Sequence, residues 1–282
     1  MKLSSQYTRP GRFLSWMQKA GFLNRYNLFW SFYEPRNFGD WIGPYLFEAW
    51  AGSSPLFYRP NTGGHSCGIF SAGSILRHIR RDATAVVWGS GIISSNDTFA
   101  EPLSVHAVRG PRSRDHLHRL GYQTTEVFGD PGILLPTVFS PTIEKSHRIG
   151  IIPHFVDYED VRSAYESASG EIRVIDVSQS VEKVIEDILS CEMTVSSSLH
   201  GIIVSHCYGI KCAWVDSWKS LMGDGVKFFD YFEAGGIRDA RPQHLSADMS
   251  VANICAIASA APFPDLHPLV EPLKSACPFK SR

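Results

Sequence analysis

The feature that most limits the possible folds is a regular alternation of two patterns between residues 148 and 216. Short apolar runs bounded by turn residues predict buried strands, and the segments between them carry apolar residues at helical spacing. In 180–190, for example, Val181, Val184 and Ile188 fall on one helical face. Strands are predicted at 148–155, 172–177, 193–197 and 211–216, and helices at 158–169, 180–190 and 199–209. This alternation favours an α/β fold with a parallel sheet covered by helices on both faces.

The N-terminal half follows the same alternation less regularly. Helices are predicted at 37–52 and 111–122, strands with turns at 67–76, 83–93 and 104–110, and a strand, a tight turn and an apolar run at 124–136. A polar, proline-marked segment at 141–147 is typical of a linker. We therefore expect an acceptor-side α/β domain (1–145), a Rossmann-like donor-side domain (146–250), and a tail (251–282) that packs back on the first domain.

The composition is that of an ordinary globular protein and excludes several classes of function. The 282 residues are 44% hydrophobic with a formal net charge of −1, which argues against nucleic acid as a partner. No run approaches the roughly 18 apolar residues that span a bilayer, and the N-terminus lacks the apolar core of a signal peptide. Six scattered cysteines without a CxxC pair indicate buried thiols rather than disulfides or a zinc site. We expect a cytoplasmic protein.

One segment departs from this even distribution of charge. Residues 1–33 carry five lysines and arginines, no acidic residue and many aromatic side chains. Such a segment can lie peripherally on an anionic membrane surface, here the inner membrane. It can equally form a helix that packs on the domain it precedes, and the sequence leaves both alternatives open.

Ligands of an open parallel sheet bind at the carboxyl ends of its strands. The residues that directly follow predicted strands are Ser196, Ser197, Ser198 and His200; His154; Gly89 and Ser90; and Arg109 and Arg112. A helix that starts at the serines presents free N–H groups and a positive dipole end to a phosphate or carboxylate. His200, in its first turn, could exchange a proton with that anion. A serine cap and a buried histidine would give the same pattern without a ligand.

The remaining candidates also have structural alternatives. Arg109 and Arg112 suit phosphate or carboxylate, although Arg112 could be solvated on a helix. Asp40 could cap a helix or act as a base for a sugar hydroxyl. Asp130, which precedes a proline, is predicted to form a turn. Lys227 lies among aromatic residues and is a candidate clamp for an anion or a sugar.

Two further observations concern ligands. Gly89 and Ser90 follow a strand, where a glycine would allow a ligand or another loop to approach closely. The sequence contains no P-loop, no GxGxxG, no paired DxD and no cluster with metal-ligand spacing. We therefore predict neither a metal nor a cofactor.

Seven short motifs follow one another between residues 35 and 235. They are "NFGD" (37–40), "VWGSGI" (87–92), "VRGPRSR" (108–114), "FGDPGILLP" (128–136), "IIPHF" (151–155), "VSSSLHGIIVSHCYGI" (195–210) and "VKFFDYF" (226–232). Each is too short to be decisive, but the ordered set is specific. In this order the motifs resemble the polysaccharide pyruvyl transferase family, most closely the ketal pyruvate transferases of xanthan-type exopolysaccharide synthesis.

The resemblance implies two Rossmann-like domains that face each other across a cleft, as in glycosyltransferases of the GT-B architecture. It implies phosphoenolpyruvate as the donor substrate and a pair of glycan hydroxyls as the acceptor. In related bacterial enzymes the acceptor is a lipid-linked oligosaccharide at the cytoplasmic face of the inner membrane, which would give residues 1–33 a role. The chain departs from the family at one point. Many members have an arginine where this chain has Ser198, so another cation must hold the donor.

Ketal formation from phosphoenolpyruvate needs a proton donor, a base and groups that hold the departing phosphate. A donor that works near neutral pH is most often histidine, and we predict His200 in this role with His154 as the second choice. Asp40 is the predicted base on the acceptor side. The phosphate would be held by the serine run and by a cation, for which Arg109, Arg112 and Lys227 are the candidates.

Two other classes of function remain open at this point. The chain could be a GT-B glycosyltransferase that uses a sugar nucleotide, in which case nucleotide rather than phosphate would be released. It could instead be a non-catalytic glycan-binding protein whose aromatic side chains stack on sugars. The aromatic candidates for such stacking are Trp41, Trp214, Trp218, Phe228, Phe229 and Tyr231.

Overall fold

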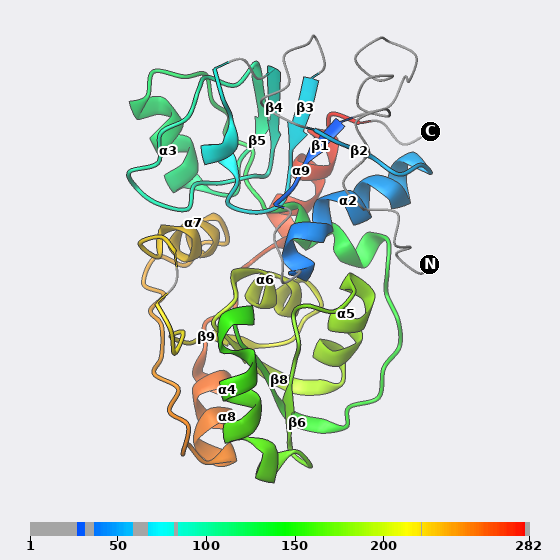
Figure 1. Cartoon of the computed structure of the whole chain (residues 1–282), viewed down its shortest axis with the longest axis vertical. Coiled ribbons are helices and arrows are strands. Elements are labelled where there is room, and N and C mark those ends of the chain that lie inside the picture. The colour runs from blue at the N-terminus through cyan, green and yellow to red at the C-terminus, as the bar shows by residue number, and fades with distance from the viewer. Residues whose placement is uncertain (1–26, 32–36, 59–66, 82–83, 221, 280–282) are drawn as a thin grey trace.

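Two parallel β-sheets occupy the two ends of an elongated molecule in the computed structural model of the chain (Figure 1). The structure describes residues 27–31, 37–58, 67–81, 84–220 and 222–279. Most of the basic, aromatic segment 1–33 lies outside these residues, so its expected membrane contact stays a prediction. The part that is described forms β1 (Asn27–Phe29), a buried strand inside the first sheet.

The first sheet has the strand order β2-β1-β3-β4-β5, and every pair is parallel. The other four strands are β2 (Leu56–Phe57), β3 (Cys67–Phe70), β4 (Thr84–Trp88) and β5 (Ser104–Ala107). A 3₁₀ turn, η2 (Leu76–His78), follows β3. The apolar faces of the strands pack against α2 (Phe38–Ala51) and its neighbours in one core, which includes the fully buried Phe38, Leu46 and Trp88.

Capping residues bound both helices of this half. The side chain of Asn37 accepts from the Gly39 amide at the start of α2, and Gly52 ends the helix with a φ of 63°. In α3 (Pro111–Arg119), Pro111 occupies the first turn, and Gly121 follows the helix with a φ of 78°. Asp40 therefore does not cap α2, because Asn37 does.

The second sheet has the order β7-β6-β8-β9 and is also entirely parallel. Its strands are β6 (His147–Ile152), β7 (Ile172–Val174), β8 (Cys191–Ser196) and β9 (Cys212–Trp214). Its helices are α4 (Tyr158–Ala164), α5 (Val181–Leu189), α6 (Leu199–Cys207) and α8 (Val251–Ala260), and its 3₁₀ turns are η4 (Phe155–Asp157) and η5 (Glu166–Ala168). The predicted α/β class with parallel sheets is confirmed.

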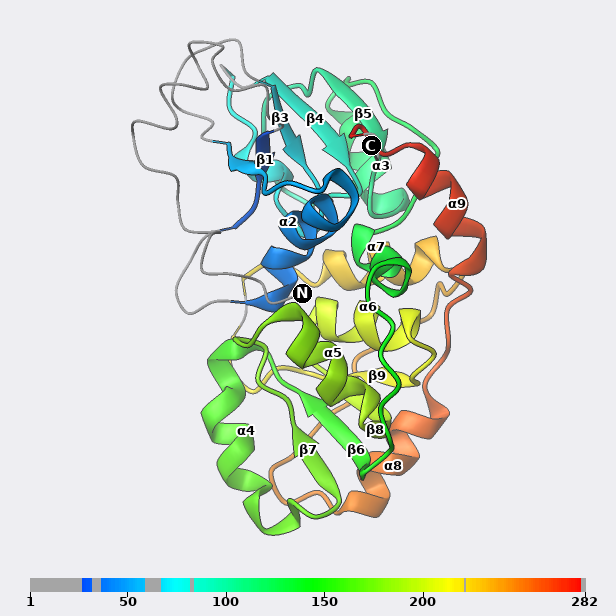
Figure 2. The ribbon, with the colours of Figure 1, turned by 90° about the vertical axis from the view of Figure 1, so that its right-hand side faces the viewer.

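The two halves meet through helices that pack between the sheets. The 3₁₀ helix η3 (Pro131–Thr137) contacts both α2 and α6, and α2 also contacts α5. The strands of both sheets point with their carboxyl ends toward this junction (Figure 2). A backbone hydrogen bond of 2.8 Å from Phe38, at the start of α2, to the carbonyl of Val177, beyond β7, joins the halves there.

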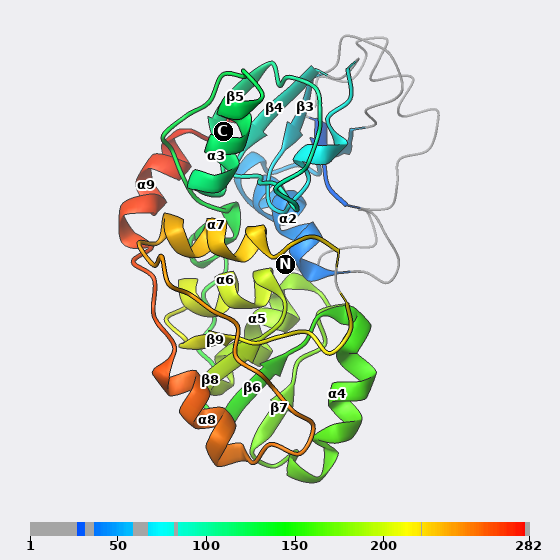
Figure 3. The same cartoon turned by 90° about the vertical axis from the view of Figure 1, so that its left-hand side faces the viewer.

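Two helices late in the chain return to the first half. Helix α7 (Val226–Ala234) follows the second sheet in sequence but packs on α3, between the halves (Figure 3). The tail divides: α8 covers the second sheet, whereas α9 (His267–Ser275) lies on the first half. There Trp88 Nε1 donates to the carbonyl of Leu273 at 2.8 Å, and Phe279 packs edge-on against Trp88.

Two predicted segments differ in the structure. In 124–136 a single bridge between Val108 and Phe128 replaces the strand, and the apolar run is the 3₁₀ helix η3, because Pro131 and Pro136 each lack a backbone donor. The helix predicted at 158–169 ends at Ala164, and a 3₁₀ turn follows. Among the described residues, none of the helices has the length and apolar character needed to span a bilayer.

Candidate active site

The predicted site residues gather where the strand order of the second sheet reverses. Strand β6 lies between β7 and β8, which are reached by crossovers in opposite directions. Ligands of open α/β sheets bind at such a switch point, at the carboxyl ends of the strands. His154 directly follows β6, and Ser196 is the last residue of β8. The site therefore begins at the place that the topology favours.

The three serines have different tasks. The hydroxyl of Ser196 accepts from the Ser198 amide at 3.0 Å and lies 2.9 Å from the carbonyl of Ile152. The hydroxyl of Ser197 accepts from the His154 amide at 2.9 Å. These two serines tie the turn between β8 and α6 to the end of β6. Ser198 is the N-cap of α6, but its side chain makes no capping hydrogen bond. In the part of the chain that the structure describes, no side chain accepts from the first amides of α6, as an anion site requires.

Gly201 allows this turn to pack tightly. A Cβ atom at Gly201 would lie 2.4 Å from the Ser196 hydroxyl oxygen and 2.8 Å from Cγ2 of Ile152. Both distances are shorter than any ordinary contact, so a side chain here would push α6 away from the strand ends. The glycine thus positions the first turn of α6, which carries His200.

The imidazole of His200 is enclosed by the other half of the molecule. Its side chain is 10% exposed, and Nε2 lies 3.6 Å from Oδ2 of Asp130, which is fully buried. A Cβ atom at Gly39, in the first turn of α2, would lie 2.0 Å from His200 Nδ1. The ring of Phe38 meets the imidazole edge-on at a centroid distance of 6.4 Å. The histidine predicted from the second half therefore reaches into the first.

Asp40, Lys227 and His154 share the electrostatic environment of this site. Burial raises the pKa of Asp40 to about 6, although His200 and Lys227 both act to lower it. Burial lowers the pKa of Lys227 to about 8, with Arg109 acting in the same direction and Asp40 against it. Burial also lowers the pKa of His154 to about 4, aided by Lys227 and opposed by Asp157. The structure thus brings these sequence-predicted residues together with His200.

The polar groups of this site lack partners elsewhere in the part of the chain that is described. The carboxylate of Asp40 and the ammonium of Lys227 make no hydrogen bond or ion pair, and Nδ1 of His154 is buried without a hydrogen-bond partner. Asp40, Lys227 and His154 are half-buried rather than fully enclosed, and the ammonium of Lys227 lies over the ring of Phe228 at 5.1 Å. Ionisable groups that lie close together without a hydrogen-bonding partner in the described residues suit a polar ligand.

The two predicted arginines are engaged within the protein. Arg109 is fully buried and donates to the carboxylate of Asp230 at 3.0 Å, as well as to the hydroxyl of Ser74 and the carbonyl of Ile92 at 2.6 Å each. Arg112 pairs with Glu233, with Nη2 donating to Oε1 at 2.6 Å. Both acidic partners lie on α7. The arginines thus fasten α7 to the first half, and Lys227 is the sequence-predicted cation left without a carboxylate partner.

Gly89 and Ser90 also serve the fold. Gly89 has a φ of 84°, and a Cβ there would lie 2.3 Å from Cδ of Pro131, so the glycine admits a neighbouring loop. The hydroxyl of Ser90 is fully buried and donates to the carbonyl of Gly73 at 2.9 Å. The close approach predicted at this position is that of another loop, which was one of the two alternatives.

The aromatic candidates for sugar stacking are mostly packed inside. Trp214 is 9% exposed and stacks on Phe228 at a centroid distance of 4.5 Å. Tyr231 is fully buried, and Trp218 donates its indole N–H to the carbonyl of Leu245 at 2.7 Å. Phe229 lies under the guanidinium of Arg112. Packing within the protein therefore covers Trp214, Phe228 and Tyr231, whereas Trp41 and Trp218 are half-buried.

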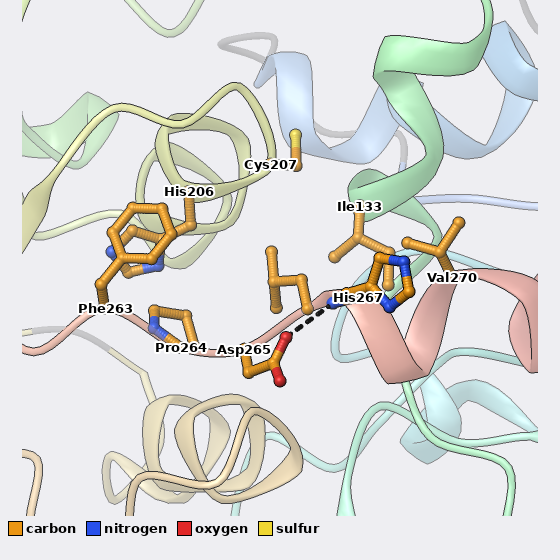
Figure 4. Close-up of a pocket in the computed structure, with 9 residues that line it drawn as sticks. Ile133, His206, Cys207, Phe263, Pro264, Asp265, His267 and Val270 are labelled. Carbon is orange, nitrogen blue, oxygen red and sulfur yellow. Dashed lines mark hydrogen bonds between the residues drawn. The ribbon is translucent and has the colours of Figure 1, made fainter.

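An apolar hollow of about 520 Å³ lies at the other end of α6 (Figure 4). Figure 4 shows Phe263 over His206, Ile133 and Val270 on the facing side, and Asp265 accepting from the His267 amide. None of the candidate residues lines this hollow. Within the described residues no group of His, Cys, Asp and Glu side chains is arranged to hold a metal ion.

Three residues of the site were not predicted in these roles. Asp130 does form the predicted turn, since Oδ1 accepts from the Gly132 amide at 2.9 Å, but its other oxygen faces His200. Asp230 is the buried partner of Arg109, and Gly39 makes room for His200. Glycine and aspartate in "NFGD" and "FGDPG" were visible as turn signals. Their contacts with His200 join distant parts of the chain, and no local pattern reveals such contacts.

The fold and the site define a parallel α/β protein in which the N-terminus of helix α6 lies between two sheets. A model of the polysaccharide pyruvyl transferase family matches residues 15–219, a range that contains Asp40, His154 and His200. The chain belongs to this family.

Two other proteins are similar to the chain. An uncharacterised protein of Acanthamoeba polyphaga mimivirus is 31% identical over 188 residues, which cover 64% of this chain and 64% of that protein. The chain thus matches less than two thirds of the length of this relative. A crystal structure of a functionally uncharacterised protein from Klebsiella pneumoniae is 11% identical, with a TM-score of 0.49 over 83% of this chain and 97% of that one.

Proposed function

We propose that the chain transfers a pyruvyl group from phosphoenolpyruvate to two hydroxyls of a glycan, forming a pyruvate ketal of an exopolysaccharide. Membership of the polysaccharide pyruvyl transferase family supports this class of reaction. The observation that carries the proposal is the convergence of Asp40, Lys227 and His200 beside the N-terminus of α6. These groups supply a base, a cation and a proton donor in one place.

The donor would be held by its two anionic groups. One anionic group could be held by the amides at the start of α6 and by the Ser198 hydroxyl, which makes no capping hydrogen bond. Lys227 suits the other, because it is positively charged below pH 8 and has no carboxylate partner among the described residues. In this proposal Lys227 takes the task of the arginine that relatives carry at the position of Ser198. Arg109 and Arg112 are left to position α7.

The reaction begins when His200 gives a proton to the methylene carbon of phosphoenolpyruvate, which leaves C2 cationic. The first glycan hydroxyl adds to C2, and Asp40 takes its proton. The bond between C2 and the phosphate oxygen then breaks, and the second hydroxyl closes the ketal on C2. Of the two hydroxyl protons, one replaces the proton that His200 gave, and the other leaves with the phosphate. Fixed cations and helix amides at the phosphate would stabilise the charge that develops there.

The charge states support these roles. A carboxyl with a pKa of about 6 is ionised at neutral pH and is a stronger base than an ordinary aspartate. His154, with a pKa of about 4, is neutral at that pH. It therefore suits a hydrogen bond to the substrate, and we assign the proton donation to His200.

We also propose where in the molecule and in the cell the reaction takes place. We infer a GT-B-like arrangement in which the second half holds the donor and the first half, with Asp40, receives the acceptor. The acceptor is proposed to be a lipid-linked oligosaccharide reached from the cytoplasmic side of the inner membrane. Residues 1–33 would provide peripheral contact with that membrane through their basic and aromatic side chains.

The test is to incubate the protein with phosphoenolpyruvate and a panel of lipid-linked oligosaccharides. We expect release of inorganic phosphate and a product with the mass of a pyruvate ketal. The His200→Ala variant should lose about 10²- to 10⁴-fold in rate, while His147→Ala, at the amino end of β6, should not. Release of nucleotide from a sugar nucleotide would instead identify a glycosyltransferase. Glycan binding without consumption of phosphoenolpyruvate would identify a binding protein.

A further inference from the structure

A fully buried carboxylate stands directly behind His200. Oδ1 of Asp130 accepts from the Gly132 amide at 2.9 Å, and Oδ2 accepts from the Gly73 amide at 3.3 Å. Oδ2 also lies 3.6 Å from Nε2 of His200. Burial alone would raise the pKa of Asp130, but His200, the Gly132 amide and Arg109 outweigh it and hold the pKa below its ordinary value. The carboxylate is therefore charged at neutral pH.

The two nitrogens of the His200 ring face different surroundings. Nε2 is buried, makes no hydrogen bond within 3.5 Å, and has Asp130 as its nearest acidic neighbour. Nδ1 lies against Gly39, which directly precedes Asp40. The ring edge that carries Nδ1 thus faces α2, the helix that carries Asp40. The ring edge that carries Nε2 faces the interior.

We propose that Asp130 is the positioning residue of His200: it holds the proton on Nε2, so that Nδ1 is the nitrogen that exchanges protons with the substrate. This inference rests on the proposed role of His200 as proton donor. A buried carboxylate that accepts from one imidazole nitrogen fixes both the tautomer and the orientation of the ring. Asp130 would also stabilise the charged ring before the proton is given away.

The other ionisable groups around His200 do not fill this position. Asp40 comes from α2, on the Nδ1 side, and Lys227 comes from α7 and acts on Asp40. His154 follows β6 and is held neutral by burial and by Lys227. Arg109 follows the end of β5, is paired with Asp230, and also acts on Asp130. Asp130 is the fully buried carboxylate of this group, and the structure places it at Nε2.

The experiment uses the full-length protein labelled with ¹⁵N-histidine and needs no substrate. The two ring nitrogens have distinct chemical shifts, and the His200 signals are assigned by their loss in His200→Gln. In the wild type we expect the neutral ring to carry its proton on Nε2. In Asp130→Asn, whose amide can donate to Nε2, that preference should be lost. A wild-type ring with its proton on Nδ1, or an unchanged tautomer in folded Asp130→Asn, would overturn the proposal.

The control is Asp97→Asn, because Asp97 is another buried carboxylate that accepts two backbone amides, from Ile93 at 2.8 Å and Ser94 at 3.3 Å. The Asp97→Asn variant should lose hydrogen bonds to backbone amides, as Asp130→Asn does, and leave the His200 tautomer unchanged. If Asp130→Asn does not fold, the wild-type tautomer alone still decides. A second measurement separates this proposal from the proposed function: kcat of pyruvyl transfer should fall in Asp130→Asn while KM for phosphoenolpyruvate stays the same. Should transfer never be observed, the tautomer result stands on its own.

Discussion

Gly39 and His200 come from opposite halves of the molecule and touch so closely that no side chain fits between them. A Cβ atom at Gly39 would lie 2.0 Å from Nδ1 of the histidine. In the proposed reaction this nitrogen gives the proton, so its placement depends on a glycine of the other half. The contact joins the "NFGD" turn to the serine-run helix, two motifs that the sequence presents far apart.

Gly39→Ala should therefore damage both activity and stability. The added methyl would meet Nδ1 of the enclosed His200 ring at 2.0 Å and the histidine Cβ at 2.9 Å, so the histidine or α2 must shift. We expect about a 10²-fold loss in pyruvyl transfer, because a displacement of about 1 Å at a reacting group can cost that much, and a loss of about 1–3 kcal/mol in the free energy of unfolding from overpacking. Gly170→Ala is the matched control, since a Cβ atom there meets nothing within 4 Å. Equal activities of the two variants would contradict the contact.

The rate of transfer should rise as the pH increases through about 6. Asp40 acts as a base only when it is ionised, and its pKa is raised to about 6 by burial. The pH profile of kcat/KM should show this acid limb, and Asp40→Asn should lower the rate by about 10²- to 10⁴-fold. Glu48→Gln, in the last turns of the same helix, serves as the control. A normal rate in Asp40→Asn would remove Asp40 from the mechanism.

Donor binding should weaken above pH 8. The pKa of Lys227 is lowered to about 8 by burial, with Arg109 acting in the same direction, so the ammonium loses its charge there. We expect KM for phosphoenolpyruvate to rise above this pH in the wild type and to stay flat in Lys227→Arg, because arginine remains charged. Lys227→Ala should raise KM by about 10- to 100-fold, the worth of a hydrogen bond to a charged group. Lys219→Ala, which removes an exposed partner of Asp160, should leave KM unchanged.

Asp40→Asn should make the protein more stable at alkaline pH. The folded pKa of about 6 exceeds the unfolded value of 3.8, so the stability linked to the protonated carboxyl is complete below 3.8 and lost as the pH rises through 6. Asparagine does not ionise, so the Asp40→Asn variant keeps this stability at high pH. A pKa difference of about two corresponds to at most about 3 kcal/mol in the free energy of unfolding. Urea unfolding at pH 8 should show this gain, and at pH 4 it should nearly vanish. A gain that is the same at both pH values would contradict the assignment.

Arg109→Met should be strongly destabilising. The substitution leaves the carboxylate of Asp230 buried without its cation, which costs about 3–5 kcal/mol in the free energy of unfolding. Arg114→Met, which removes more exposed pairs with Asp115 and Glu126, should cost about 1 kcal/mol or less. Urea unfolding measures both, and the double variant Arg109→Met/Asp230→Leu should recover part of the loss. A cost below that of Arg114→Met would show that the buried pair does not hold α7.

The sequence was sufficient to predict the α/β class with parallel sheets and which strand ends carry the candidate site residues. The helix predicted at 37–52 ends at Gly52, because a cap depends on a few adjacent residues. The rule that ligands bind at strand carboxyl ends placed His154 and His200 in one region. Both predictions rest on short-range patterns, and the structure agrees with them.

Local sequence patterns could not predict which groups the charged residues contact. The guanidinium of Arg109 is suited to bind an anion. Its partner in the structure is Asp230, which lies 121 residues away and is brought near only by the packing of α7. Asp130 satisfies a turn and also faces His200, and the turn alone explains its local sequence. The apolar run after the predicted turn was assigned no regular structure, and the 3₁₀ helix η3 that it forms was not foreseen.

Helices α7 and α9 come late in the chain but pack on the first half, and this limits how the protein can be recombined with its relatives. A fragment ending near residue 145 would lack Asp230, Leu273 and Phe279, and would bury Arg109 without a counterion. A chimera that exchanges the first half must therefore take three separate stretches of gene, encoding the first sheet with η3, α7 and α9. A single crossover point in the linker would divide an ion pair and an aromatic cluster between two parents.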